Sequence, residues 1–368
     1  FYLPLFTKKL PDLNWENPQV RQAVYNLMIW WLDRGVDGFR IDALNFAMHD
    51  PQFRDNPPAP ANGKARTRPF DFQLKVHNQS HPDIPAFIAR IRALTDEYEG
   101  IFTVAEVGGD EALGEMRAFT ADETHLNSAY GFDFLYADKL TPGLVCGALA
   151  QWPDEAGLGW PSWAFENHDA PRALSRWCAP ADRAAFARMK MLLLMALRGN
   201  VILYYGEELG LTQVDIPFEQ VQDPEAIANW PLTLSRDGAR TPMPWQPSTC
   251  GGFGSDSPWL PMGDENRLKA VAAQQDDPQS LLNHTRTMLA LRRAHPALRL
   301  GAVSRCDVRG QMLVLGRRSD SECVRAFVNL GAEPVVLTPG EADGDVLCSV
   351  NGATADGLPP FGALVVLA

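Results

Sequence analysis

Apolar residues recur every three or four positions in four long stretches of the chain, which is the spacing of a helix with one buried face. The first stretch opens with Asn17 and Pro18, and proline is favoured in the first turn of a helix because the N–H it lacks would have no partner there. Gly35 ends the same stretch. The predicted helices cover residues 17–34, 83–98, 181–198 and 281–298, with Asp83 as the cap of the second.

Short apolar runs typical of strands alternate with these helices. Three runs end in a carboxylate, at Asp42, Glu106 and Asp169, and two more end near Phe134 and Tyr205. Parallel strands that alternate with helices build an α/β barrel, in which the C-terminal ends of the strands meet at one mouth. We therefore predict an α/β fold that brings the three carboxylates together, an arrangement suited to chemistry at the anomeric carbon of a sugar.

The strand at residues 38–42 gives the clearest indication of a site. Its alternation places Arg40 and Asp42 on one face and Ala43 on the other. An arginine and a carboxylate on a buried strand are costly to remove from water unless they pair or face a polar cavity. A purely structural ion pair explains these two residues as well, so both interpretations stay open on this stretch alone.

The hydrophobic period changes to two after Gly301, which predicts short antiparallel strands. These strands cover residues 312–315, 323–328, 334–337 and 363–367. We therefore divide the chain into an α/β part at residues 1–299 and a small C-terminal β-sandwich domain at residues 300–368.

Composition excludes several classes of partner. The 368 residues carry a formal net charge of −12, which argues against binding to nucleic acid or to an anionic membrane. No run of about 18 apolar residues occurs, so we expect no membrane-spanning helix. The six cysteines show no paired spacing and are predicted to be free thiols in a reducing compartment, without a disulfide or a zinc site. The expected location is therefore cytoplasmic.

Five stretches carry a resemblance to a known family. Residues 38–43 (GFRIDA), 105–107 (AEV) and 167–169 (NHD) resemble three of the four signature regions of the α-amylase superfamily. Residues 204–210 (YYGEELG) and 240–245 (RTPMPW) resemble its oligosaccharide-cleaving α-glucosidase branch. All five occur in the order in which the family has them. Glu207 and Glu208, within the fourth stretch, are expected to be structural.

The resemblance implies a role for each carboxylate. Asp42 would be the nucleophile, with its ionised form stabilised by Arg40. Glu106 would be the general acid and base, a role that needs a drier and less positively charged surrounding. Asp169 would stabilise the developing positive charge and hold sugar hydroxyl groups.

Three further residues are expected to bind substrate: Arg40, His168 and Arg240. The stretch around Arg240 departs from the branch, which more usually has glutamine and aspartate where this chain has Pro244 and Gln246. The contacts of that loop are therefore left open.

The function that the resemblance implies is that of a retaining, exo-acting α-glucosidase, which releases terminal glucose from short α-glucosides through a covalent glycosyl-enzyme. A small residue at position 43 accompanies a preference for α-1,4 bonds in the family. The alternatives are a glucosyltransferase or sucrose-processing relative with the same site, and a non-catalytic relative of the transporter heavy-chain type. A carbohydrate-binding module is a third class, disfavoured because mere binding does not need buried carboxylates.

The count of predicted barrel strands is five, whereas a closed (β/α)8 TIM barrel has eight. In the family, three strands and the first signature region precede the part that this chain matches. We therefore expect an incomplete barrel, the C-terminal portion of a longer protein, whose N-terminal portion is a partner alongside a small oligosaccharide substrate. We expect no cofactor or metal in this segment, and a structural Ca²⁺ or Mg²⁺ in the N-terminal part stays open.

Overall fold

The computed structural model of the chain describes residues 2–6, 9–61, 69–109, 112–152, 159–232, 235–254 and 257–368. The chain divides into two compact units. Unit 1 consists of Phe1–Phe132 and Glu155–Pro161, and unit 2 consists of Asp133–Asp154 and Ser162–Ala368.

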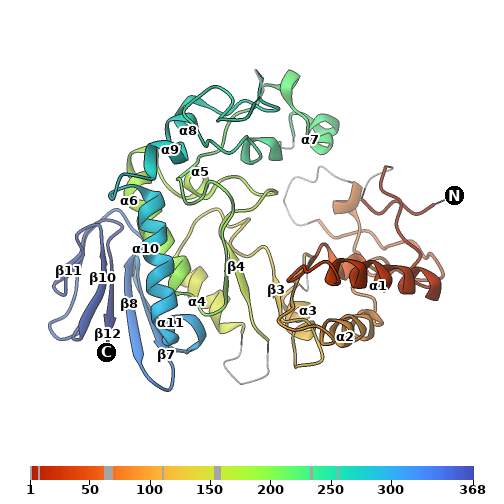
Figure 1. Cartoon of the computed structure of the whole chain (residues 1–368), viewed down its shortest axis with the longest axis horizontal. Coiled ribbons are helices and arrows are strands. Elements are labelled where there is room, and N and C mark those ends of the chain that lie inside the picture. Colours follow the sequence, from red (N-terminus) through yellow and green to blue (C-terminus); the bar gives the residue numbers. More distant parts are fainter. Residues whose placement is uncertain are drawn as a thin grey trace. The chain divides into compact units, whose positions relative to one another are not determined.

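Unit 1 contains a parallel sheet of three strands in the order β1-β2-β3: β1 (Gly38–Ile41), β2 (Phe102–Glu106) and β3 (Ser128–Tyr130). Ala105 pairs with Ile41 on one side and with Ala129 on the other, so the strand ends lie level. The helical elements of this unit are α1 (Pro18–Leu32), η1 (Leu44–Phe46), η2 (Pro69–Phe72), α2 (Ile84–Thr95) and α3 (Ala112–Ala118). Helices α1 and α2 run side by side (Figure 1), and the ring centroids of Tyr25 and Phe87 lie 6.0 Å apart between them.

The beginnings of these two helices follow the sequence prediction to different degrees. The Asn17 side chain accepts a hydrogen bond from the backbone N–H of Gln19 at 2.9 Å, which satisfies a free donor in the first turn of α1. Asp83 occupies the predicted position before α2, but its side chain makes no capping hydrogen bond. The capping role predicted for Asp83 is therefore wrong.

Unit 2 contains two parallel strands, β4 (Ser162–Ala164) and β5 (Asn200–Ile202), which pair with Trp163 opposite Val201. Its helical elements are α4 (Pro142–Ala150), α5 (Ala173–Trp177), η3 (Pro180–Asp182), α6 (Arg183–Ala196), η4 (Phe218–Gln220), α7 (Pro224–Asn229), η5 (Arg236–Ala239), α8 (Asp264–Leu268), α9 (Val271–Gln274), α10 (Leu281–Ala294) and α11 (Pro296–Leu300). Helix α6 is buried along its second half and packs against α10 (Figure 1).

The single helix predicted at residues 281–298 is wrong, because the structure has two helices there. Helix α10 ends at Ala294 and α11 starts at Pro296. Proline disfavours the helical conformation in the residue before it. His295 accordingly has extended backbone with φ −110° and ψ 106°, and this residue separates the two helices.

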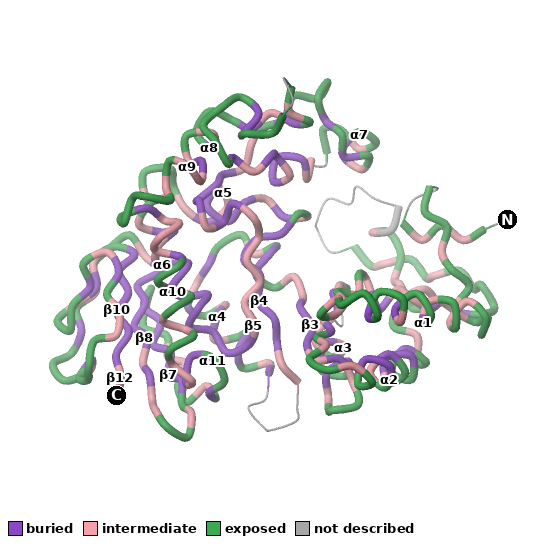
Figure 2. The backbone as a smooth tube through the Cα atoms, viewed as in Figure 1, coloured by how far each residue is buried: buried purple, intermediate pink, exposed green. Residues whose placement is uncertain are grey.

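The C-terminal strands form one antiparallel sheet in the order β10-β12-β8-β7-β6 and a separate strand pair. They are β6 (Ala302–Arg309), β7 (Met312–Arg318), β8 (Cys323–Asn329), β9 (Val335–Val336), β10 (Asp345–Val350), β11 (Gly357–Leu358) and β12 (Ala363–Leu367), with β9 paired to β11. Figure 2 shows β7, β8 and β12 as largely buried, and Val314, Phe327 and Leu364 belong to their core. The sequence did not predict β6 and β10, since both are edge strands in which apolar alternation is weak, nor β11, which has only two residues.

A disulfide joins Cys146 of α4 to Cys306 of β6, with Cα atoms 5.7 Å apart. The prediction of six free thiols is therefore wrong, although the other four cysteines are free: Cys178, Cys250, Cys323 and Cys348. The two bonded cysteines are 160 residues apart in sequence, and only the packing of α4 against β6 brings them together. Because disulfides persist mainly in oxidising compartments, the cysteine argument no longer supports a cytoplasmic location.

The architecture confirms an α/β part with parallel strands followed by an antiparallel β part. The incomplete barrel and the domain boundary at residue 299 stay predictions. Across the described ranges, no helix has both the length and the apolar character needed to cross a membrane.

The close approach of β1 to β2 leads to a first prediction. Gly38 has φ 152°, and a Cβ atom there would lie 1.8 Å from the carbonyl oxygen of Phe102. We predict that Gly38→Ala in the full-length protein lowers the free energy of unfolding by about 2–4 kcal/mol, because a backbone carbonyl must move. Denaturant unfolding followed by circular dichroism measures the change.

Gly114→Ala in α3 is the matched control, since no atom lies within 4 Å of its Cβ position. Alanine in a helix is favoured over glycine by about 0.5–1 kcal/mol, so this variant should be as stable as the parent or slightly more so. Equal stability losses in the two variants would contradict the role of the β1–β2 contact.

The disulfide leads to a second prediction. Titration of the denatured 368-residue chain, purified without reductant, should find four free thiols before reduction and six afterwards. Cys146→Ser should lower the free energy of unfolding by about 2–5 kcal/mol, as removal of a native disulfide typically does. Cys323→Ser, which changes a free cysteine, should have a small effect. Six thiols before reduction would refute the bond and favour the reducing compartment.

Candidate active site

The first cluster of site residues lies at the ends of the three strands of unit 1. Arg40, on β1, donates from Nη1 to Oδ1 of Asp42 at 2.7 Å and from Nη2 to Oε2 of Glu106. The same Nη2 donates to the hydroxyl of Tyr130 at 2.8 Å, and that hydroxyl donates to Oε2 of Glu106. We call Arg40, Asp42, Glu106 and Tyr130 the Arg40 cluster. The strand register explains it, because Glu106 pairs directly with Tyr130.

The two carboxylates of the Arg40 cluster differ in their contact with water. The Asp42 side chain is 72% exposed, whereas the Glu106 side chain is 10% exposed. Glu106 is therefore the drier of the two, as predicted. Its surrounding is not less positively charged, however, since one guanidinium contacts both carboxylates, and that part of the prediction is wrong. Burial, with the hydrogen bond and charge of Glu106, raises the pKa of Tyr130, which keeps its proton available for donation.

Ala43 does not continue the alternation of β1. The strand ends at Ile41, and Ala43 has φ 43° and ψ 43°, the left-handed conformation that turns the chain into η1. The predicted placement of its side chain on the opposite face of the strand is therefore wrong. Beyond this turn, Asn45 is fully buried and donates to the carbonyl of Gly108 at 2.6 Å, which ties the loop after β1 to the loop after β2.

The second cluster lies in unit 2, in the turn that follows β4. The Asn167 side chain accepts hydrogen bonds from the backbone N–H groups of Asp169 at 2.9 Å and Ala170 at 2.8 Å, which fixes the turn. His168 Nε2 lies 3.4 Å from Oδ2 of Asp169. Arg240 donates from Nε to the carbonyl of His168 at 2.7 Å and from Nη2 to Oδ1 of Asp169 at 2.8 Å. The structure thus brings together the three predicted residues of this unit: His168, Asp169 and Arg240.

A second arginine reaches the same carboxylate. Arg236 Nη1 donates to Oδ1 of Asp169 at 3.1 Å, while its Nε and Nη2 hold the two oxygens of Asp223 at 2.9 and 2.7 Å. Burial acts to raise the pKa of Asp223, but the hydrogen bonds and charge of Arg236 outweigh it and lower that pKa to about 2. Asp223 is therefore an anion that orients Arg236. We call His168, Asp169, Arg236, Arg240 and Asp223 the Asp169 cluster.

Four charged side chains lie almost completely buried in unit 2, and we call them the buried charge cluster. Glu166 is contacted by Arg172 at 3.1 Å and by Lys190 at 3.2 Å, and Lys190 also contacts Glu207 at 2.7 Å. Burial acts to raise the pKa of Glu166, but the charges of Lys190 and Arg172 outweigh it and lower that pKa. Burial raises the pKa of Glu207 to about 7, against the charge of Lys190. The burial of Glu207 fits the structural role expected for it.

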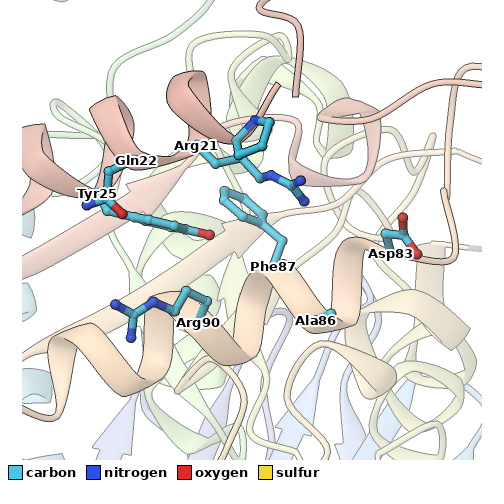
Figure 3. Close-up of a pocket in the computed structure, with 8 residues that line it drawn as sticks. Arg21, Gln22, Tyr25, Asp83, Ala86, Phe87 and Arg90 are labelled. Atoms are coloured by element: carbon cyan, nitrogen blue, oxygen red, sulfur yellow. The ribbon is translucent and has the colours of Figure 1, made fainter. Parts of the chain in front are cut away.

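A pocket of about 360 Å³ lies elsewhere in unit 1, between α1 and α2 (Figure 3). Tyr25 and Phe87 line it together with Arg21 and Arg90, and the guanidinium of Arg90 lies 5.7 Å from the ring centroid of Tyr25. The lining includes none of the residues predicted for the site. Among the residues that the structure describes, no group of three or more His, Cys, Asp or Glu side chains is arranged to hold a metal ion.

Sequence reasoning missed three members of the two clusters: Tyr130, Arg236 and Asp223. Arg236 lies four residues before Arg240, and this spacing of two arginines was the available signal. Tyr130 ends a short apolar run, so nothing local separates it from a core tyrosine. Asp223 is paired with a residue 13 positions away, which no local pattern indicates.

The chain is similar to a known protein family and to individual proteins over most of its length. The family model for the alpha amylase catalytic domain matches residues 1–301. A probable alpha-glucosidase of Rhizobium meliloti is 41% identical in an alignment 343 residues long, which covers 90% of this chain and 62% of that protein. An oligo-1,6-glucosidase of Parageobacillus thermoglucosidasius is 31% identical in an alignment 332 residues long, which covers 82% of this chain and 58% of that protein. The chain thus spans about three-fifths of the length of these relatives.

The chain is also similar to solved structures of enzymes over its whole length. An alpha-glucosyl transfer enzyme, XgtA, is 36% identical and superimposes with a TM-score of 0.91 over 100% of this chain and 70% of its own. Isomaltulose synthase from Erwinia rhapontici NX5 is 25% identical, with a TM-score of 0.85 over 100% of this chain and 71% of its own. The family fold is a TIM barrel with a C-terminal antiparallel β-sheet domain. From the extent of these matches, the chain belongs to the alpha-amylase catalytic domain family.

Proposed function

We propose that the protein containing this chain is a retaining, exo-acting α-glucosidase, which releases terminal glucose from short α-glucosides through a covalent glycosyl-enzyme. The observation that carries the proposal is the contact of one Arg40 guanidinium with both Asp42 and Glu106. A shared guanidinium keeps two carboxylates close together, as a retaining site with a separation of about 5–5.5 Å requires. The wider gap of an inverting site, about 6.5–9.5 Å, leaves room for a water molecule between them.

The exposures of the two carboxylates suit different roles. In the proposed first step, a carboxylate oxygen of Asp42 bonds to the anomeric carbon, the glycosidic C–O bond breaks, and Glu106 gives its proton to the departing oxygen. In the second step, Glu106 takes a proton from water, whose oxygen bonds to the anomeric carbon as the bond to Asp42 breaks. Arg40 and Tyr130 both contact Oε2 of Glu106, so we assign the proton transfers to Oε1.

The proposed role of the Asp169 cluster is to bind and stabilise the glucosyl group. Asp169 would accept hydrogen bonds from sugar hydroxyls, with His168 and Arg240 beside it as further hydrogen-bond donors. Two guanidiniums, of Arg236 and Arg240, already hold Oδ1 of Asp169, so this carboxylate is oriented before substrate binds. A fixed charge of this kind stabilises a developing positive charge without reorganising during the reaction.

A second candidate function is glucosyl transfer, in which a sugar hydroxyl replaces water in the second step. Two half-exposed aromatic side chains favour it. Trp259 donates its indole N–H to the carbonyl of Arg240 at 3.1 Å, and its ring lies edge-to-face with Phe253 at 5.6 Å. Aromatic faces suit sugar rings, so this pair would offer an acceptor a surface next to Arg240. The XgtA and isomaltulose synthase matches are in keeping with this candidate.

Other parts of the function also remain proposals. The chain spans 62% and 58% of the two curated relatives above, which supports an N-terminal portion of the same protein that completes the barrel. The substrate, the lack of a cofactor in this segment, the structural Ca²⁺ or Mg²⁺ considered for the N-terminal part, and the cytoplasmic location stay predictions. The non-catalytic, transporter heavy-chain-like alternative predicts no turnover of any α-glucoside by the full-length protein.

A third prediction tests the roles of the two carboxylates in the full-length protein. With an activated α-glucoside and azide, Glu106→Ala should yield the α-glucosyl azide, because the covalent intermediate still forms and azide opens it. Asp42→Gly should instead yield the β-glucosyl azide by direct displacement. Nuclear magnetic resonance of the product distinguishes the two anomers. The same anomer from both variants would overturn the assignment.

A fourth prediction concerns the proposed preference for α-1,4 bonds. The parent protein should cleave maltose with a higher kcat/KM than isomaltose. Ala43→Val should lower the ratio of kcat/KM on maltose to kcat/KM on isomaltose, by a factor that corresponds to no more than about 1–3 kcal/mol. Valine should also lower the melting temperature, since a β-branched residue is strained at φ 43°. Ala43→Gly is the control, because it removes that strain without added bulk and should keep the preference. A parent that prefers isomaltose, or an unchanged ratio in Ala43→Val, would end the proposal.

A further inference from the structure

The buried charge cluster is an unusual place for an arginine. The side chains of Glu166, Arg172 and Lys190 are each 1% exposed, and that of Glu207 is 0% exposed. Removing such charges from water costs several kcal/mol per ion, and well-packed apolar residues are often equally stabilising in their place. Stability alone therefore does not explain why Arg172 is buried here.

Arg172 uses both terminal nitrogens to hold backbone from two separate loops. Nη1 donates to the carbonyl of Tyr205 at 2.6 Å as well as to Glu166, and Nη2 donates to the carbonyl of Ala239 at 3.1 Å. The guanidinium carbon also lies 4.5 Å from the ring centroid of Tyr204 and 5.0 Å from that of Tyr205. Arg172 thus connects the loop after β5 to the η5 segment.

The Ala239 carbonyl is the point at which this cluster meets the proposed active site. It accepts hydrogen bonds from Arg172 at 3.1 Å and from the hydroxyls of Tyr204 and Tyr205 at 3.1 and 3.4 Å. The next residue is Arg240, whose guanidinium contacts Asp169 at 2.8 Å. A displacement of the Ala239 carbonyl would therefore move the backbone from which Arg240 reaches its carboxylate.

We infer that Arg172 is a positioning residue that sets the Arg240 guanidinium against Asp169 through the Ala239 carbonyl. This inference rests on the proposed function, because it assigns Asp169 to the stabilisation of the transition state. Arg172 itself contacts neither the sugar nor the reacting atoms in this assignment. Its effect should consequently fall on the chemical step more than on binding of the substrate.

Arg172→Lys in the full-length protein tests the inference. Lysine keeps a positive charge for Glu166 but cannot hold two carbonyls in the fixed fork of a guanidinium. We expect kcat on an activated α-glucoside to fall by about 10–100-fold, the scale of a misplaced catalytic group, with a smaller change in KM. Tyr204→Phe, which removes the shorter of the two tyrosine hydrogen bonds to the Ala239 carbonyl, should lower kcat in the same direction by a smaller factor.

Arg317→Lys is the matched control. Arg317 is also 1% exposed, and it donates to two carbonyls, those of Ala196 and Gly301, each at 2.7 Å, in unit 2. Arg317→Lys should lower the melting temperature about as much as Arg172→Lys does, while its kcat should stay within about twofold of the parent's kcat. Equal losses of kcat in the two variants, or an unchanged kcat in Arg172→Lys, would overturn the inference and show a merely structural role.

A structural readout separates the inference from the proposed function. In a crystal structure of Arg172→Lys, Arg240 should no longer contact Asp169, and a retained contact at the parent's distance would overturn the inference whatever the activity. An inactive parent protein would refute the α-glucosidase proposal instead. Should Arg172→Lys fail to fold, a crystal structure and the kinetics of Arg172→Gln decide the same question. An unmoved Arg240 and an unchanged kcat in that variant would be the refuting results.

Discussion

A charged side chain withdrawn from water needs an opposite charge beside it, and this requirement governs both candidate clusters. Glu106 is largely buried and lies against the guanidinium of Arg40. Asp223 is buried and holds Arg236, whose remaining nitrogen contacts Asp169. In each case a pairing that burial makes necessary also places a carboxylate in a defined orientation. The same contacts that stabilise the fold therefore orient the carboxylates of the candidate site.

Strand register gives the Arg40 cluster its geometry. The parallel pairing of β1 with β2 and of β2 with β3 sets the ends of three strands level with one another. Side chains at those ends become neighbours although they are 66 and 90 residues apart in sequence. Asp42 and Ala43 lie just beyond the paired region, where the chain turns, and this explains why Asp42 is open to solvent while Glu106 is not.

The Asp169 cluster uses a different means of orientation. Asp169 lies in a turn fixed by Asn167. Two arginines donate hydrogen bonds to its carboxylate: Arg236 in the η5 segment and Arg240 directly after it. The η5 segment is in turn held by Arg172 and by the hydroxyls of Tyr204 and Tyr205, all of which donate to the Ala239 carbonyl. Layers of hydrogen bonds thus replace strand pairing where the chain is irregular, which is how a loop acquires the rigidity that a site requires.

The sequence by itself determined the elements whose cause is local. The apolar spacing after Asn17 specified α1, the runs before Asp42 and Glu106 specified β1 and β2, and motif order indicated the family. The prediction missed the break before Pro296, although its cause is local, because proline acts on its immediate neighbour. The edge strands β6 and β10 were not readable, since one exposed side weakens the alternation on which prediction depends.

Tertiary structure decided the pairings between distant residues. The disulfide between Cys146 and Cys306 and the approach of Arg40 to Glu106 and Tyr130 each join segments whose separation in sequence carries no signal. The left-handed backbone of Ala43 likewise depends on the chain leaving the sheet for η1, which the alternation of β1 does not show. A local pattern records which face of an element is buried, whereas the partner on that face is chosen only when the elements pack together.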